Sequence, residues 1–246
     1  MENTKIDYVK STWNPVTGCL HGCDYCYARR IANRFNGGKI IQYGVRTVLD
    51  KPIYIDGKIS PYPYGFLPTF HKYRLGECLN KKGRNIFVCS MADLFGEWVP
   101  DEWIEEVFEA CDKAPQHNYL FLTKNPWRYA DLAYKRKLPK NDNMWYGYSY
   151  TGQDHETKGW FDDEYNIFVS MEPLLDNIST TLAKWIIVGA ETGHRNDKVV
   201  PDRKWIEEIV DSCQKVNIPV FMKSSLANIW GEPLIQEFPA GLKKGR

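Results

Sequence analysis

From about residue 86 onward, short and continuously apolar segments alternate with segments of helical periodicity. This order is typical of parallel strands joined by crossover helices, and continuous apolar strands are those covered on both faces. The sequence therefore predicts an α/β fold, a partial or complete (β/α) barrel whose functional residues lie at the carboxyl ends of the strands. A first strand is expected near Ser11–Val16, and the later ones at Ile86–Ser90, Tyr119–Thr123, Met144–Tyr150, Ile167–Met171, Trp185–Gly189 and Pro219–Lys223.

Two amphipathic segments repeat almost the same pattern, WIEEVFEAC at 103–111 and WIEEIVDSC at 205–213. Pro-Asp precedes each of them and is a helix-start signal. We expect both to be crossover helices that pack against the sheet.

Residues 36–83 interrupt the alternation with a segment rich in aromatic residues, Gly and Pro. We expect an insertion or cap within a single domain that spans residues 1–246. Long loops of this kind are often functional lids or binding loops. A small hairpin that covers one end of the barrel is the alternative.

The composition limits the possible partners. Lys and Arg total 32 against 31 Asp and Glu, so the overall charge cannot attract a polyanion and any nucleic-acid contact needs a local patch. No segment approaches the roughly 18 apolar residues of a membrane span, and the first residues lack the apolar centre of a secretion signal. We expect a cytoplasmic protein that does not bind membranes.

Three of the seven cysteines, Cys19, Cys23 and Cys26, lie within eight positions. This crowding favours metal binding in a reducing compartment over a disulfide framework. Gly18 and Gly22 let the backbone curl around a bulky inorganic cluster. Three thiolates on a four-iron cluster leave one iron open to a substrate or cofactor.

A helix is expected directly after these cysteines. Tyr27, Ile31 and Phe35, with Ala28 and Ala32, form its predicted packing stripe, and Asn36-Gly37-Gly38 is expected to end it.

A zinc site is the main alternative, with His21 as the fourth ligand of a closed tetrahedron. A disulfide with a spare thiol is a weaker one. Cys89, Cys111 and Cys213 lie in apolar strand or helix patterns and are expected to be core residues, and Cys78 belongs either to the core or to the cap.

The motif Cys19-x3-Cys23-x2-Cys26, with the aromatic Tyr25 before the last cysteine, resembles that of the radical S-adenosylmethionine (radical SAM) superfamily. The resemblance implies a 4Fe–4S cluster whose open iron binds the amino and carboxylate groups of S-adenosylmethionine. It also implies cleavage to a 5′-deoxyadenosyl radical that abstracts hydrogen from a substrate, and a flavodoxin- or ferredoxin-like reducing partner.

Over its full length the chain resembles a phage- and prophage-associated family of three-cysteine proteins described as radical-enzyme-like, whose reaction is undefined. That resemblance implies fold and cofactor. It is carried by TWNPVTGC (12–19), YCYARRIANRF (25–35), PTFHKYRL (68–75), IFVCSMADLFGEWVPDEWI (86–104), LTKNP (122–126), SMEPLL (170–175) and IIVGAETG (186–193).

Polar residues at the predicted strand ends are the candidate site. The superfamily has a Gly-Gly-Glu run after the second strand that receives the cofactor's amino group, and here the corresponding place reads Ser90-Met91-Ala92-Asp93. The expected cofactor-binding residues are Tyr25, Ser90, Asp93, Ser149, Glu172, Gly189 and Glu191, and Glu172 and Lys223 are the catalytic candidates. An ordinary helix cap remains the alternative for each hydroxyl or carboxylate.

Three other polar side chains bear on the same site. Lys124 and Lys223 are cations that suit a cofactor carboxylate or a substrate phosphate. His71 is either a substrate-facing group or a histidine bonded within the cap, and we assign it no catalytic role.

Basic residues cluster at 29–34, 81–84 and 135–140, and the cap adds Tyr62, Tyr64, Phe66, Phe70 and Tyr73. Aromatic residues interleaved with cations suit stacking on an unpaired or flipped base. We hypothesise a nucleic-acid base or nucleotide as substrate, in DNA base modification or repair if the phage resemblance holds. A radical enzyme that acts on a peptide or small metabolite, and a zinc-stabilised interaction module without enzymatic activity, are the alternatives.

Overall fold

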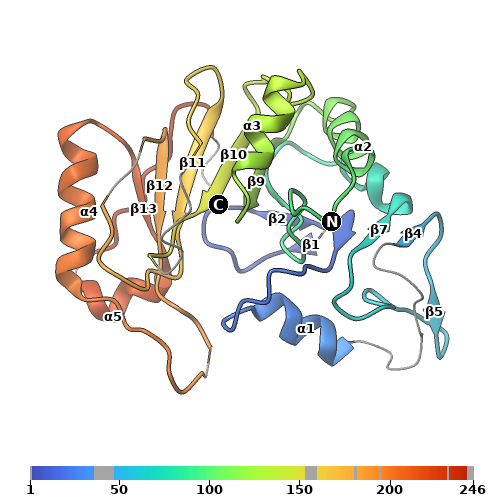
Figure 1. Cartoon of the computed structure of the whole chain (residues 1–246), viewed down its shortest axis with the longest axis horizontal. Helices are drawn as coiled ribbons and strands as arrows, with labels where there is room; N and C mark the ends of the chain where they lie inside the picture. Colours follow the sequence, from blue (N-terminus) through green and yellow to red (C-terminus); the bar gives the residue numbers. More distant parts are fainter. Residues whose placement is uncertain are drawn as a thin grey trace.

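The computed structural model describes residues 2–35, 47–152, 160–179, 182–193, 195–231 and 233–242. Its main element is an eight-stranded sheet with the order β1-β2-β8-β9-β10-β11-β12-β13. The last seven of these strands run parallel and curl into a half-barrel, and β1 (Glu2–Asn3) runs antiparallel beside β2 (Figure 1). The predicted α/β partial barrel is therefore confirmed. Its parallel strands are β2 (Ser11–Trp13), β8 (Asn85–Val88), β9 (Asn118–Thr123), β10 (Met144–Ser149), β11 (Asn166–Met171), β12 (Trp185–Val188) and β13 (Val220–Met222).

Both faces of this sheet are covered by apolar side chains. On β11, Ile167 and Val169 belong to the core between sheet and helices, whereas Phe168 belongs to a second cluster on the opposite face. Tyr8 belongs to that second cluster, where its ring makes an edge-on contact with Trp185 at 5.7 Å between centroids. This two-sided burial explains why the strands read as continuous apolar segments.

The expected crossover helices form. α2 (Asp101–Asp112) follows Pro100, and α4 (Arg203–Lys215) begins after Asp202, whose carboxylate accepts a hydrogen bond from Lys204 N. α3 (Trp127–Tyr134) lies between β9 and β10, and η2 (Ser224–Leu226) and α5 (Ala227–Trp230) follow β13. None of the helices in the described parts of the chain is long and apolar enough to cross a membrane.

The described part of the 36–83 region forms a small sheet of its own and a hairpin. β3 (Val16–Thr17) pairs antiparallel with β7 (Thr69–His71), which pairs parallel with β4 (Thr47–Leu49). β5 (Tyr54–Ile55) and β6 (Lys58–Ile59) make the hairpin, and η1 (Lys72–Cys78) is a 3₁₀ helix that leads towards β8. The segment is thus hydrogen-bonded to the strand that directly precedes the cysteines.

α1 (Tyr27–Phe35) forms where expected, but its packing stripe differs from the predicted one. Ala28 and Ala32 are buried against Met91, whereas Tyr27 and Phe35 are 45% and 56% exposed. The helix uses the narrow alanine side because small residues allow close approach to the loop after β8. The predicted stop at residues 36–38 lies outside the described residues.

Candidate metal centre

The loop of residues 18–26 is fixed at its start between the two sheets. Gly18 N donates to Met91 O at 2.9 Å, and Gly18 makes an isolated parallel bridge with Ala92 after β8. The next amide, Cys19 N, donates to Phe66 O at 3.1 Å in the cap. The cysteines therefore lie at the carboxyl ends of β2 and β8, where a barrel of parallel strands carries its functional residues.

The two glycines of this loop are required for different reasons. Gly18 has a φ of +89°, and a Cβ there would lie 2.2 Å from the Leu67 carbonyl oxygen. Gly22 has a φ of +77° with no atom within 4 Å of the same position. Gly18 thus permits a close backbone approach, whereas Gly22 supplies only a left-handed turn.

Cys19, Cys23 and Cys26 are all partly exposed and reduced, in contrast to the buried cysteines of the core. Cys26 Sγ accepts a hydrogen bond from Arg29 N at 3.4 Å, in the first turn of α1. Within the described residues, no three His, Cys, Asp or Glu side chains converge on one point as ligands of a single metal ion.

The Cys19 thiol is largely withdrawn from solvent. Burial raises its pKa to about 12; the backbone N–H of His21 acts in the opposite direction, and the charges of Asp93, Cys23 and Cys26 raise it further. Cys19 is thus close enough to the other two cysteines for their charges to affect its pKa. Thiolates are the ligands of iron–sulfur clusters, so three thiols in one glycine-containing loop fit that group, and loading must release the Cys19 proton.

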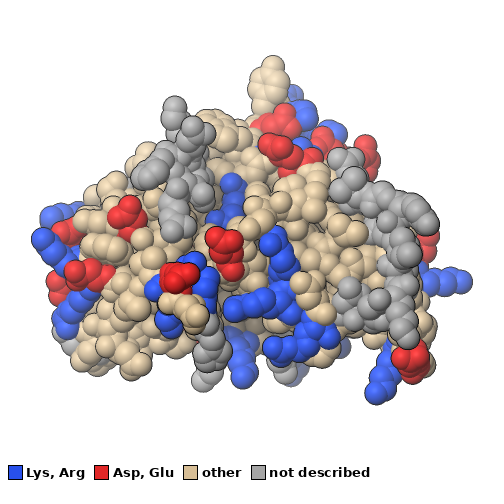
Figure 2. Space-filling view, turned by 60° about the horizontal axis from the view of Figure 1, so that its bottom comes forward, with Lys and Arg blue, Asp and Glu red and all other residues tan. Residues whose placement is uncertain are grey.

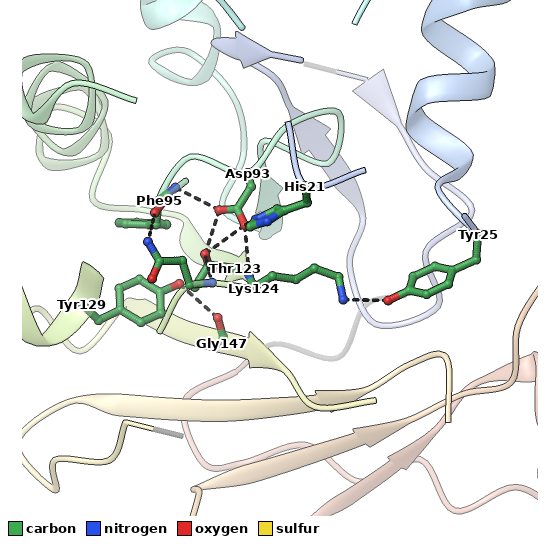
Figure 3. A network of polar contacts seen from close by, with 9 residues as sticks. His21, Tyr25, Asp93, Phe95, Thr123, Lys124, Tyr129 and Gly147 are labelled. Atoms are coloured by element: carbon green, nitrogen blue, oxygen red, sulfur yellow. Dashed lines mark hydrogen bonds and ion pairs between the residues drawn. The ribbon is translucent and has the colours of Figure 1, made fainter. Parts of the chain in front are cut away.

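Asp93, one of the expected cofactor-binding residues, lies at the centre of a hydrogen-bonded network (Figure 3). The residue is 5% exposed, and its carboxylate accepts from Phe95 N at 3.0 Å, Thr123 Oγ1 at 2.8 Å and Lys124 N at 2.9 Å. His21 Nε2 donates to the same carboxylate at 2.7 Å. Asp93 thereby links the cysteine loop to the ends of β8 and β9.

Tyr25 and Ser90 also have protein partners. Lys124 Nζ donates to the Tyr25 hydroxyl at 2.6 Å and lies 5.2 Å from the centroid of its ring (Figure 3). Ser90 Oγ donates to Asn14 Oδ1 at 3.1 Å, and Ser90 O accepts from the Tyr27 hydroxyl at 2.7 Å. Tyr25 directly precedes Cys26, and Ser90 contacts the residue that directly follows it.

Glu172 and Lys223 form an ion pair across the end of β12. Glu172 follows β11 and Lys223 follows β13, and their side chains are 21% and 15% exposed. A Cβ on Gly189 would lie 3.1 Å from carbons of both side chains, so this glycine makes room for the pair. A cofactor that approached the backbone at Gly189, as expected from the sequence, would meet these two side chains.

The charge of Glu172 also affects the hydroxyls of two tyrosines. Although Tyr27 is 45% exposed, desolvation around its hydroxyl raises its pKa, and the negative charges of Glu172 and Cys26 raise it further. Burial raises the pKa of Tyr8, and the charge of Glu172 adds to this effect. Glu172 therefore lies within electrostatic reach of the residue that follows the last cysteine.

The other two expected residues lie in different surroundings. Ser149 pairs in register with Ser170 on β11, and the buried Ser170 hydroxyl has no hydrogen-bond partner among the described residues. Glu191 accepts two hydrogen bonds from Arg195, at 2.9 and 2.8 Å, and this interaction holds the pKa of Glu191 below its ordinary value. Glu191 is thus paired with a residue of the segment that follows β12.

His71 lies at the end of β7, in the small sheet. It is fully buried, hydrogen-bonded with Thr17 Oγ1 at 2.9 Å and with the Tyr73 hydroxyl at 3.3 Å. Burial, followed by the charge of Arg74, lowers its pKa to about 3. Of the two interpretations of His71, the structure agrees with the histidine bonded within the cap.

Of the basic clusters, only the one at residues 29–34 lies beside the cysteine loop. Residues 81–84 precede β8 and 135–140 precede β10, and strand starts form the opposite edge of a parallel sheet. Lys137 is also paired with Glu105 at 2.6 Å, and Lys140 with Glu164. Figure 2 shows Lys and Arg gathered near the middle of the face that carries α1, with some Asp and Glu among them.

The expected aromatic stacking surface is only partly present. Phe70 is fully buried against Trp103, with ring centroids 5.3 Å apart, because it belongs to the central strand of the small sheet. Tyr62 and Phe66 pack against the alanine side of α1. Phe70 is therefore removed from the set of base-stacking candidates.

The sequence did not predict two sets of hydrogen bonds that hold the site together. Asn14 Oδ1 accepts from Ser90 Oγ and from Met91 N at 3.0 Å, which ties the ends of β2 and β8 together. The His21–Asp93 bond joins residues 72 positions apart. Asn14 lies in the TWNPVTGC segment next to the cysteines, and this position was the only sequence feature that could have indicated a role for it.

Fold and site together define a half-barrel of seven parallel strands with a three-cysteine loop at the strand ends. The chain belongs to the family described as "Protein of unknown function (DUF5131)", whose model matches residues 3–237. No curated protein matches it.

Two solved structures of spore photoproduct lyase are similar to this chain. One, complexed with dinucleoside spore photoproduct, has a TM-score of 0.42 and 10% identity over 82% of this chain and 49% of that chain. The other, a cysteine-to-serine mutant, has a TM-score of 0.48 and 9% identity over 90% of this chain and 79% of that one. This chain spans about half the length of the first, and similarity this low assigns no function to it.

Proposed function

We propose that this protein is a radical SAM enzyme. The observation that carries the proposal is the placement of Cys19, Cys23 and Cys26 in one loop at the carboxyl ends of a parallel half-barrel. Their spacing and Tyr25 match the motif of that superfamily. When bound, a reduced 4Fe–4S cluster supplies the electron that cleaves S-adenosylmethionine to a 5′-deoxyadenosyl radical.

The residues at the carboxyl ends of the strands have distinct roles in this proposal. The three thiolates hold the cluster and leave one iron open to the cofactor. The hydroxyls of Ser149 and Ser170 lie side by side on neighbouring strands and can bind the polar groups of the cofactor. Glu172 and Lys223 place a carboxylate and an ammonium group together, so they can orient a substrate with both donor and acceptor atoms.

The enzymatic proposal is tested by measuring 5′-deoxyadenosine after anaerobic reconstitution and reduction with S-adenosylmethionine. Wild-type protein is expected to release it, whereas Cys23→Ala and Cys26→Ala are expected to release none. Cys78→Ala is the matched control, because this thiol is buried in η1. Equal release by Cys23→Ala and the wild type would refute the assignment, and full zinc occupancy without product would favour the interaction module.

For the substrate we propose a nucleic-acid base or nucleotide. The support is local: Arg29, Arg30 and Arg34 lie on the helix directly after the cysteines, and the guanidinium of Arg29 lies 5.8 Å from the Phe66 ring centroid. Such cations can pair with phosphates beside the cysteine loop and keep the reacting base over the strand ends.

Salt-dependent binding to single-stranded DNA and RNA tests the substrate class. The double variant Arg29→Ala/Arg30→Ala is expected to reduce the dependence of log affinity on log salt by about one unit for each phosphate that is no longer neutralised. Lys81→Ala/Lys82→Ala is the control, since these exposed lysines precede β8 at the opposite edge. Absence of salt-sensitive binding, with conversion of a peptide or small metabolite instead, would overturn the substrate proposal.

A further inference from the structure

Asp93 is held mainly by the barrel itself. Three of its four donors, Phe95 N, Thr123 Oγ1 and Lys124 N, belong to the segments after β8 and β9. A carboxylate offers about four lone-pair sites, and these three donors with His21 use them. Asp93 is therefore a fixed point of the strand ends, and the cysteine loop is attached to it through His21.

His21 is an unusual residue to find between Cys19 and Cys23. Three thiolates and one imidazole are a common ligand set of structural zinc sites, in which every coordination position is filled by protein. Here the imidazole is directed to the strand ends, where Nε2 donates to Asp93 at 2.7 Å (Figure 3). The ring also lies edge-on to Trp98 at 4.8 Å between centroids. Its side chain is only 22% exposed.

We propose that Asp93 is a positioning residue that determines the ligand set of the cysteine loop. It holds His21 against the ends of β8 and β9, so the loop presents three thiolates instead of three thiolates and an imidazole. The same bond fixes the loop relative to the strand ends. The inference rests on the proposed function only in taking the three cysteines as the metal ligands.

The opposite arrangement is chemically reasonable and makes the proposal testable. Histidine ligands commonly donate their second ring N–H to a carboxylate, so His21 could bind metal through Nδ1 with Asp93 behind it. Removal of His21 would then remove a ligand. Under the proposal, removal of His21 leaves the ligand set unchanged.

Cobalt(II) titration of the metal-free, full-length protein separates the two arrangements, because cobalt(II) replaces zinc and its absorbance reports thiolate and nitrogen ligands. His21→Ala is expected to bind cobalt(II) within about twofold of the wild type and with the same spectrum. Asp93→Asn, which is similar in size, replaces one acceptor oxygen by an NH2 group, so the side chain can no longer accept from all four donors. The variant is expected to bind about tenfold more tightly because His21 is released. The double variant is expected to return to the wild-type value.

Two results would overturn the proposal. The first is a large loss of cobalt(II) affinity in His21→Ala, which would make His21 a ligand. The second is an Asp93→Asn protein, folded by circular dichroism, that binds no more tightly than the wild type. Neither result depends on cofactor cleavage, so the proposed enzymatic function can stand or fall separately.

Thiol alkylation provides a second measurement that does not need the Asp93 variants to fold. A hydrogen bond to a charged group holds the loop, so its removal in His21→Ala is expected to raise the alkylation rate of the loop thiols about tenfold. Cys213, buried on α4, is the internal control and keeps its rate. Unchanged loop rates would contradict the positioning role.

Discussion

The seven cysteines of this protein fall into two groups that differ in exposure. Cys111 and Cys213 are fully buried on α2 and α4. Cys23 and Cys26 are partly exposed in a loop at the strand ends. The comparison teaches that position in the half-barrel separates packing cysteines from candidate metal ligands.

The largest expected effect comes from exchanging the two kinds of cysteine for serine. Cys23→Ser should lose nearly all cluster iron after anaerobic reconstitution and change the free energy of unfolding of the metal-free protein by less than about 0.5 kcal/mol. Cys213→Ser should keep the iron, but its free energy of unfolding should fall by about 1–3 kcal/mol because a buried hydroxyl replaces an apolar thiol. Iron and sulfide analysis with urea unfolding measures both.

The reverse pattern would break the comparison. If Cys213→Ser lost iron while Cys23→Ser kept it, the ligands would have to be sought in the core.

The next effect concerns how the loop is attached to the core. Gly18→Ala and Gly22→Ala both place an alanine at positive φ, at a cost of about 1–2 kcal/mol. Gly18→Ala adds a contact of 2.2 Å with the Leu67 carbonyl oxygen, so we expect it to lose about 3 kcal/mol in total. Urea unfolding of the two metal-free variants gives the difference, and equal losses would show that the loop is not packed on the cap at Gly18.

The last effect is a gradual pH dependence that comes from His71 in β7. The pKa of His71 is lowered from 6.5 to about 3, so the unfolded chain binds the extra proton first as the pH falls. Its contribution to stability is therefore fully present above pH 6.5 and is lost between pH 6.5 and about 3, by up to about 1.4 kcal/mol per pH unit. His71→Gln should flatten the unfolding free energy over this window, and an unchanged slope would place the titrating group elsewhere.

Much of the half-barrel could be predicted because its strands are buried on both faces and therefore leave continuous apolar segments. β3 and β7 were not predicted, since two or three residues leave no period to detect. For α1, the helical period identified a packing side but not which of two adjacent stripes makes the contact. Tyr27 consequently proved half-exposed, and Ala28 and Ala32 carry the packing.

The candidate site shows a similar division. The topology of parallel strands places Glu172 and Lys223 at one edge, and the structure pairs them. Bonds between side chains distant in sequence leave no pattern, so the partners of Asp93 could not be foreseen. The sequence identifies polar residues at the strand ends, whereas their partners depend on contacts that only the folded chain determines.

The most direct test of the central claim is electron paramagnetic resonance of anaerobically reconstituted and reduced protein, recorded with and without S-adenosylmethionine. We predict the signal of a reduced 4Fe–4S cluster whose g values change when the cofactor is added, because one iron is open to it. A signal that does not respond to the cofactor, or a reconstituted protein that forms no such cluster, would contradict the assignment of Cys19, Cys23 and Cys26 as a radical SAM site.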